Sequence, residues 1–217
     1  MGDLKRLSAL VLASMPVMTP EEEAERNAQD ARRAAEERRQ RLESIGLPIT
    51  AADENLLVSG KLRADVGRSL AAVQAWIADA SAPPWIVLCG SVGRGKTLAA
   101  AWLLLEHGGR YAGARELERL RMAAFGDEAA RFQELLSGRV LVIDDLGRED
   151  SPDRMTSALL DAVDARRRAR MRTIAIANLT RKQLEQRYRD ERLWSRLGEC
   201  AVFVADAGPD LRAKGKP

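Results

Sequence analysis

The sequence predicts an α/β fold in which a parallel sheet of five strands is flanked by helices. Short, nearly continuous apolar segments recur between residues 85 and 205, and helical segments follow the first four of them. Strands that are apolar along their whole length are typical of a parallel sheet that is covered on both faces. The expected strands are residues 85–89, 110–114, 139–144, 172–177 and 201–205.

The composition fits one globular domain with an appendage. The chain has 217 residues, 46% of them hydrophobic, and domains usually contain about 100–200 residues. Charged residues make up 31%, but the net charge is only +3, which is typical of solvated helix faces and local ion pairs. The slight positive excess permits a nucleic-acid partner without requiring one.

The cysteines and the histidine exclude several kinds of site. Cys89 and Cys200 lie far apart and outside any CxxC pattern, which argues against a disulfide scaffold or a zinc site and suits a reducing cytosol. A single histidine, His107, excludes a multi-histidine metal site. No run approaches the roughly 18 apolar residues of a membrane span. We therefore expect a soluble, cytoplasmic protein without a membrane partner.

The first 45 residues are expected to form a helical arm. Leu4, Leu7, Val11 and Met15 have helical spacing and predict a short amphipathic helix, which either packs on its own protein or docks a partner. Thr19, Pro20 and Glu22 predict the start of a second, very polar helix that ends at Gly46. Its polarity is typical of a solvated arm, and a partner-binding helix is the alternative. A further helix is expected over residues 56–80.

The segment GSVGRGKT, residues 90–97, follows the first strand and precedes a helix, and it matches the Walker A pattern G-x-x-x-x-G-K-T. Its glycines permit a tight loop whose N–H groups point inward, at the positive end of the next helix. Lys96 supplies a charge for the β- and γ-phosphates, and the Thr97 hydroxyl is a ligand for Mg²⁺. The pattern predicts a loop that binds a nucleoside triphosphate.

Polar side chains end two later strands. Asp144 and Asp145 follow an apolar strand in the Walker B arrangement, in which Asp144 would hold Mg²⁺ and Asp145 would polarise the attacking water. Asn178 closes the strand RTIAIA and is suited to orient that water, although an Asn at a strand end is also ordinary turn chemistry.

Arg192 and Arg196 are four residues apart and share one face of a predicted helix. An arginine supplied to a neighbour's γ-phosphate accelerates hydrolysis by roughly 10³–10⁵-fold. Two helix arginines can equally be ordinary surface ion-pair partners.

Taken together, GSVGRGKT, VLVIDD, the Asn178 that closes RTIAIAN, and SRL at 195–197 resemble the AAA+ ATPases, in the order of that family's motifs. IDDLGRE, ANLT and the tail GPDLR resemble, more narrowly, the replicative helicase loaders of the DnaC type. The likeness covers roughly residues 46–212. It implies a P-loop NTPase fold with an AAA+ core, in which residues 46–217 form the ATPase domain and residues 1–45 are a candidate helicase-binding region.

The resemblance implies specific roles. Lys96, Asp145, Asn178 (sensor 1) and Arg196 (the arginine finger, with Arg192 as second choice) would be catalytic, and Thr97 and Asp144 would bind Mg²⁺. The strand that ends at Asn178 would lie between the P-loop strand and the Walker B strand. The residues implied in ATP binding are Gly90, Ser91, Val92, Gly93, Arg94, Gly95, Lys96, Thr97, Leu98 and the sensor 2-like Arg212.

The chain departs from the AAA+ pattern in two places. Many of these proteins have Glu where this one has Asp145, and the shorter side chain predicts slow hydrolysis. The chain after Arg196 is too short for the C-terminal lid domain of most AAA+ proteins, which helicase loaders also lack.

Loaders of this type assemble into oligomers and bind single-stranded DNA. Two segments are candidates for that contact. Arg166, Arg167, Arg168, Arg170 and Arg172 form a basic cluster, which would serve either phosphates or the dipole of the helix that it ends. Residues 115–125 lie where loaders carry a DNA-contacting element.

The predicted function is ATP-dependent loading of a DnaB-type replicative helicase onto single-stranded DNA by a homo-oligomer. A transposition helper ATPase of the IstB type shares the core, but its usual sequence differs from Arg148-Glu149-Asp150. An adaptor that uses ATP as a switch with little hydrolysis is the third hypothesis.

Overall fold

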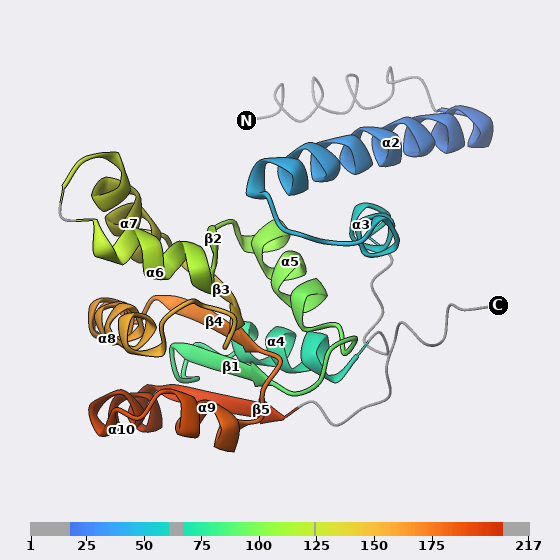
Figure 1. The fold of residues 1–217 in the computed structure, drawn as a ribbon. Coiled ribbons are helices and arrows are strands. Elements are labelled where there is room, and N and C mark those ends of the chain that lie inside the picture. The colour runs from blue at the N-terminus through green and yellow to red at the C-terminus, as the bar shows by residue number, and fades with distance from the viewer. Residues whose placement is uncertain (1–17, 61–66, 124, 206–217) are drawn as a thin grey trace, which may run out of the picture. The chain divides into compact units, whose positions relative to one another are not determined.

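The computed structural model describes residues 18–60, 67–123 and 125–205 (Figure 1).

The chain divides into two compact units, Met1–Glu37 and Arg38–Pro217. Helix α2, Pro20–Ile45, crosses this division, so its last turns belong to the larger unit. The predicted domain boundary after residue 45 stays a prediction. The expected first helix, with Leu4, Leu7, Val11 and Met15, lies outside the described residues, and so does the chain end on which the expected lack of a lid domain depends.

Helix α2 begins as the sequence predicts. The backbone N–H of Thr19 donates to the Glu22 carboxylate at 2.8 Å, and the N–H of Glu22 donates to the Thr19 hydroxyl at 3.3 Å. These reciprocal bonds form the expected capping box. The helix ends at Ile45, before Gly46, whose φ is 69°. A left-handed backbone at this position stops a helix and favours glycine.

The single helix expected over residues 56–80 is not found. The structure has α3, Ala51–Val58, and α4, Arg68–Ala78, instead. Gly60 and Gly67, which lie between them, have φ of 64° and 151°. The apolar spacing of the segment indicated helix correctly, but these glycines take a backbone that a helix does not allow.

The five predicted strands are confirmed, and they form one parallel sheet. They are β1 Trp85–Cys89, β2 Arg110–Gly113, β3 Val140–Leu146, β4 Arg172–Ala177 and β5 Ala201–Ala205. Their order is β2-β3-β4-β1-β5, so β4 lies between β1 and β3, as the resemblance implies. β3 extends past the predicted end to Leu146, with a register shift against β4 between Ile143 and Leu146.

Each face of the sheet has its own apolar core. Ile86, Leu88, Val142 and Ile174 pack on one face with α4 and with α5, Lys96–His107. The alternate residues, such as Val87, Leu141 and Ala175, pack on the other face with the helices that follow β2 along the chain. These helices are α6 Ala114–Met122, α7 Asp127–Ser137, α8 Pro152–Arg168, α9 Arg181–Arg187 and α10 Glu191–Cys200 (Figure 1).

Because all five strands run in the same direction, their carboxyl ends share one edge of the sheet. Cys89, Gly113, Asp144 and Ala177 lie at or close to this edge. Ligands of open α/β sheets bind at such an edge. Within the described part of the chain, none of the helices combines the length and the apolar character that a membrane span requires.

Candidate nucleotide-binding site

The glycine-rich loop joins β1 to α5. β1 ends at Cys89, and α5 begins at Lys96. Gly93 and Gly95 have φ of 83° and 75°, a backbone that residues with a side chain rarely adopt. The loop leads directly into the amino end of α5, where unpaired N–H groups and the helix dipole favour an anion.

Lys96 is the buried cation of this loop. Only 4% of its surface is exposed. Its Nζ donates to the backbone carbonyls of Gly90 and Ser91, at 2.9 and 2.7 Å. These bonds satisfy a buried ammonium and hold it against the loop. An anion that entered the loop would therefore meet both the ammonium and the N–H groups of the backbone.

The other loop residues can serve a ligand chiefly through their backbone. Arg94 Nε donates to the Ser91 hydroxyl at 3.0 Å, and the side chain of Val92 is exposed. Leu98, in the first turn of α5, has its side chain buried.

Thr97 and Asp144 bring two oxygen ligands together from different parts of the chain. The Thr97 hydroxyl donates to Asp144 Oδ2 at 3.2 Å. Asp144 is buried at 4% exposure, and this burial raises the pKa of its carboxyl group. A hydroxyl beside a buried carboxylate is a donor set that suits Mg²⁺, which binds few protein oxygens and keeps phosphates and waters as its other ligands. Among the described residues, no group of three or more His, Cys, Asp or Glu forms an alternative metal site.

Asp145 has an unusual backbone. Its φ is 57°, which is uncommon for a residue other than glycine, and it lies in the register shift of β3. Its N–H donates to Asp144 Oδ1 at 2.7 Å. Its own Oδ1 accepts a hydrogen bond from Asn178 Nδ2 at 3.1 Å and lies 3.7 Å from Arg148 Nε. The structure thus brings together the two polar strand ends that the sequence singled out.

The segment after β4 also contacts the glycine-rich loop. The Gly90 N–H donates to the Leu179 carbonyl at 3.1 Å. Three segments therefore meet at the carboxyl edge of the sheet: the loop 90–97, the pair Asp144–Asp145, and Asn178–Leu179. This arrangement can bind a phosphate chain with a cation and hold a carboxylate close to it.

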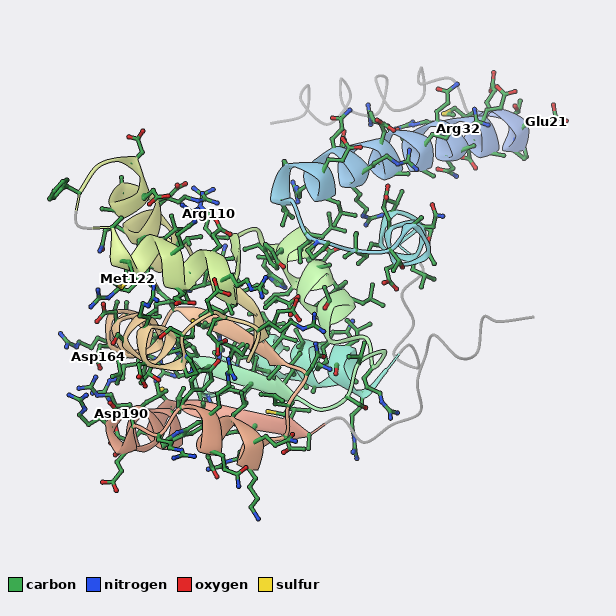
Figure 2. All side chains as sticks on the ribbon, in the orientation of Figure 1. Glu21, Arg32, Arg110, Met122, Asp164 and Asp190 are labelled. Atoms are coloured by element: carbon green, nitrogen blue, oxygen red, sulfur yellow. The ribbon has the colours of Figure 1, made fainter. Side chains whose placement is uncertain are left out.

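The candidate arginine finger lies on α10, in an ion pair within its own chain. Arg196 Nη1 bonds to Asp164 on α8. Arg192 is more exposed and pairs with Asp190, the residue that caps α10, at 2.7 Å. Asp164 and Asp190 lie on the same side of Figure 2, at α8 and at the start of α10. Arg212, the implied sensor 2 arginine, lies outside the described residues.

The structure divides the basic cluster at residues 166–172 into structural and exposed members. Arg166 is fully buried, and its guanidinium bonds to Thr173 Oγ1 and to the carbonyls of Leu136, Gly138 and Arg172, all at 2.7–2.8 Å. Arg172 bonds to the carbonyls of Asp79, Ala82 and Pro83 and lies over the ring of Trp76. The buried Arg166 guanidinium bonds to the core and is not exposed to a nucleic-acid phosphate, whereas Arg172 is partly exposed and its contact with DNA stays a prediction. Arg168 and Arg170 are exposed.

The other DNA candidate, residues 115–125, comprises most of α6 and the residues that follow it, of which residue 124 lies outside the described part of the chain. Its arginines pair with acids: Arg119 with Glu128, and Arg121 with Asp161. Met122, labelled in Figure 2, exposes 56% of its surface, and Phe125 exposes 87%. The role of this segment stays a prediction.

Sequence reasoning missed a buried polar cluster beside the site. Glu149 is buried, and its carboxylate accepts hydrogen bonds from the Gly147 N–H and the Tyr188 hydroxyl, both at 2.8 Å, and from Arg187 Nε at 2.5 Å. The motif IDDLGRE contains Glu149, but its spacing gives no sign that Tyr188, far along the chain, would bond to it.

The fold, more than the sequence, is similar to known proteins. No protein-family model and no curated protein matches the chain. A crystal structure of the DnaC helicase loader matches with a TM-score of 0.52 and 23% identity, over 64% of this chain and 88% of that chain. DnaI matches with a TM-score of 0.54 and 20% identity, over 64% of this chain and 84% of that chain.

A replication initiator, DnaA bound to AMPPCP and single-stranded DNA, also matches. Its TM-score is 0.52 at 19% identity, over 65% of this chain and 46% of that chain, so this chain spans less than half of that DnaA chain. At these identities the likeness shows the fold. The α/β fold with a five-stranded parallel sheet, which the sequence predicts, is therefore the fold that this chain shares with these solved structures.

Proposed function

We propose that the protein is an ATPase that loads a DnaB-type replicative helicase onto single-stranded DNA. One observation carries the ATPase part: the loop 90–97, Asp144–Asp145 and Asn178 meet at one edge of the sheet, within hydrogen-bond distance of each other. Likeness in fold to the DnaC helicase loader and to DnaI supports the loader part.

Each residue of the site has a role in this proposal. The loop N–H groups and Lys96 bind the β- and γ-phosphates of ATP. Thr97 and Asp144 would hold Mg²⁺, which when bound neutralises phosphate charge. Asn178 occupies Oδ1 of Asp145, so Oδ2 is the oxygen that takes a proton from the attacking water.

Arg196 would complete the site of a neighbouring subunit, which requires a homo-oligomer. Its ion pair with Asp164 would have to open before the guanidinium could reach a γ-phosphate in another subunit. The pair is partly exposed, and partly exposed ion pairs contribute little stability, so neighbouring phosphate charge can compete with it.

A nucleotide switch with little hydrolysis is the second candidate. The observation that favours it is the environment of Asp145, whose Oδ1 lies 3.7 Å from Arg148 Nε besides its bond to Asn178. These contacts engage one oxygen of the carboxylate and leave the side chain less free to turn toward an attacking water. In this case the loop would bind ATP and change the assembly state with very slow turnover.

Capture of the host's replicative helicase tests the loader proposal. Immobilised full-length protein should retain the helicase with ATP present, and Lys96→Ala should lose any ATP dependence. Deleting residues 1–45 should spare ATP binding and lose the helicase. Turnover measured with and without single-stranded DNA then separates a loader from a switch. If the full-length protein failed to capture the helicase under either condition, the loader proposal would be wrong.

Arginine substitutions test the finger. Arg196→Ala should leave ATP affinity within about threefold but lower turnover by at least about tenfold, because a finger acts mainly on the transition state. Arg192→Ala on the same helix is the matched comparison. Normal turnover by Arg196→Ala at a protein concentration that saturates assembly would exclude Arg196 as the finger. A loss of turnover with Arg192→Ala alone would identify Arg192 as the finger.

A further inference from the structure

The turn between β3 and α8 holds Asp145 in a strained backbone conformation. Asp145 has a φ of 57°, and the residue two positions later, Gly147, has a φ of 98°. A positive φ at a residue with a side chain persists only where the surrounding structure holds it. The contacts around this turn should therefore include groups that hold it in place.

The carboxylate of Glu149 is the centre of these contacts. Its side chain is fully buried. Oε2 accepts from the Gly147 N–H and from the Tyr188 hydroxyl, both at 2.8 Å, and Oε1 accepts from Arg187 Nε at 2.5 Å. The Gly147 N–H also lies 3.0 Å from the Tyr188 hydroxyl. A buried carboxylate with three donors is fully satisfied and fixes the position of each donor.

The same turn is packed against the segment that carries Asn178. A Cβ on Gly147 would lie 2.6 Å from Leu179 Cδ1, so the two segments are already in close contact. Leu179 in turn accepts the hydrogen bond from the Gly90 N–H of the glycine-rich loop. Glu149 therefore binds the turn at Gly147, the residue that lies against Leu179 next to Asn178.

The other side of the cluster leads to α10. Tyr188 ends α9 and is 1% exposed. Its carbonyl accepts a hydrogen bond of 2.6 Å from Trp194 Nε1 on α10. The path from Asp145 to the helix that carries Arg196 thus runs through Glu149 and Tyr188, each in a fixed position.

We propose that Glu149 is a positioning residue: it holds the β3–α8 turn so that Asp145 meets Asn178, and through Tyr188 it ties this geometry to α10. The inference rests on the proposed ATPase function. A positioning role requires that a change at Glu149 lower turnover more than it lowers ATP affinity or stability. An ordinary structural role makes no such requirement.

The chain contains a matched control in Glu118. This glutamate is also buried, at 4% exposure, and it too accepts hydrogen bonds from the β3–α8 turn. Its Oε2 accepts from the N–H groups of Asp150 and Ser151, at 2.9 and 3.3 Å. Glu118 therefore binds the far end of the same turn, without a bond to Gly147 or to α9 among the described contacts.

The test compares Glu149→Gln with Glu118→Gln in the full-length protein. Calorimetry gives ATP affinity, steady-state assays give kcat and KM, and thermal melting gives stability. We expect Glu149→Gln to lower kcat at least about tenfold with ATP affinity within about threefold, and Glu118→Gln to keep kcat within about twofold. Tyr188→Phe, which keeps the packed ring, should lower kcat in the same direction and add little to Glu149→Gln.

Equal kcat values in the two Gln variants, or equal losses of affinity and kcat in Glu149→Gln, would overturn the proposal. If Glu149→Gln did not fold, normal kcat in Tyr188→Phe would overturn it. Failure of the ATPase function itself is recognised separately, since the wild-type protein would then show no turnover, and the role of Glu149 would fall with it.

Discussion

Among the described residues, two buried cations, Arg166 and Lys96, differ in the groups that hold them. Arg166 is fully buried between α8 and the sheet, and its guanidinium bonds to one hydroxyl and three carbonyls. Lys96 is buried in the glycine-rich loop, where Nζ donates to two carbonyls of the loop itself.

The surroundings of the two cations explain the difference. Burial lowers the pKa of Arg166 to about 10, but its acceptors come from several packed elements and leave no room for a ligand. The carbonyls around Lys96 belong to a short loop at the sheet edge, next to Asp144, whose pKa burial raises. A buried cation whose hydrogen bonds all go to the packed core has a structural role. A buried cation that is held by a loop, beside a buried carboxylate, is suited to bind a ligand.

Replacing Arg166 should give the largest loss in the free energy of unfolding. A small loss would contradict the structural role that distinguishes Arg166 from Lys96. Arg166→Met removes the donor of two buried and two part-buried hydrogen bonds, and each buried acceptor that stays unpaired costs about 1–3 kcal/mol. We expect the free energy of unfolding to fall by about 3–5 kcal/mol, a large part of the total for a domain. Chemical denaturation measures it, with exposed Arg168→Met as control, expected within about 0.5 kcal/mol of wild type. Equal stability of the two variants would contradict a structural role for Arg166.

Replacing Lys96 should show the reverse pattern. Lys96→Ala removes the charge that meets the phosphates, and we expect ATP affinity to fall at least about 100-fold, or about 2.7 kcal/mol. The free energy of unfolding should change by less than about 1 kcal/mol, because the loop carbonyls lie near the surface and water can replace the ammonium. Calorimetry and denaturation measure both quantities, with Lys182→Ala on α9 as the control. Unchanged ATP affinity would remove the functional half of the comparison.

The sequence predicted these two centres with unequal success. Lys96 lies in a motif whose spacing has a direct physical meaning, so strand, loop and helix could be placed from local residues alone. The strands and their order were also predictable, since apolar runs and the family resemblance indicate them. Arg166 was grouped with its neighbours as a basic cluster, because no local pattern distinguishes an arginine that turns into the core from one that faces water.

Two other features also depend on contacts between distant residues. The left-handed backbone of Asp145 and the bonds from Glu149 to Tyr188 arise only when β3, β4 and α9 pack together. The break between α3 and α4 depends on glycines that a helical apolar pattern hides. Sequence patterns predict well which polar residues at strand ends belong to the site. They do not predict which polar side chains, such as Arg166 and Glu149, become buried in the core.

Replacing Asp144 should give a small effect on the free energy of unfolding, and the sign of this effect sharpens the comparison. Burial raises the pKa of this carboxyl group in the folded protein. A raised folded pKa means that the group's favourable contribution is complete below the unfolded pKa, near 3.8, and is lost as pH rises through the folded value. Above the unfolded pKa, the raised folded pKa of Asp144 therefore lowers the stability of the fold in the absence of a cation.

Asp144→Asn removes that charge and can keep both hydrogen bonds, since its oxygen can accept from the Asp145 N–H and its amide can donate to Thr97 Oγ1. We expect the variant to be more stable than wild type by roughly 1 kcal/mol at pH 7 without Mg²⁺, and the difference to shrink as pH is lowered toward 4. Mg²⁺ with nucleotide should stabilise the wild type more than the variant, because binding to the folded state alone raises stability. Denaturation at several pH values, with and without Mg²⁺, measures these differences. A variant that was less stable than wild type at pH 7 would show that Asp144, like Arg166, is held by the fold and is not strained in preparation for a cation.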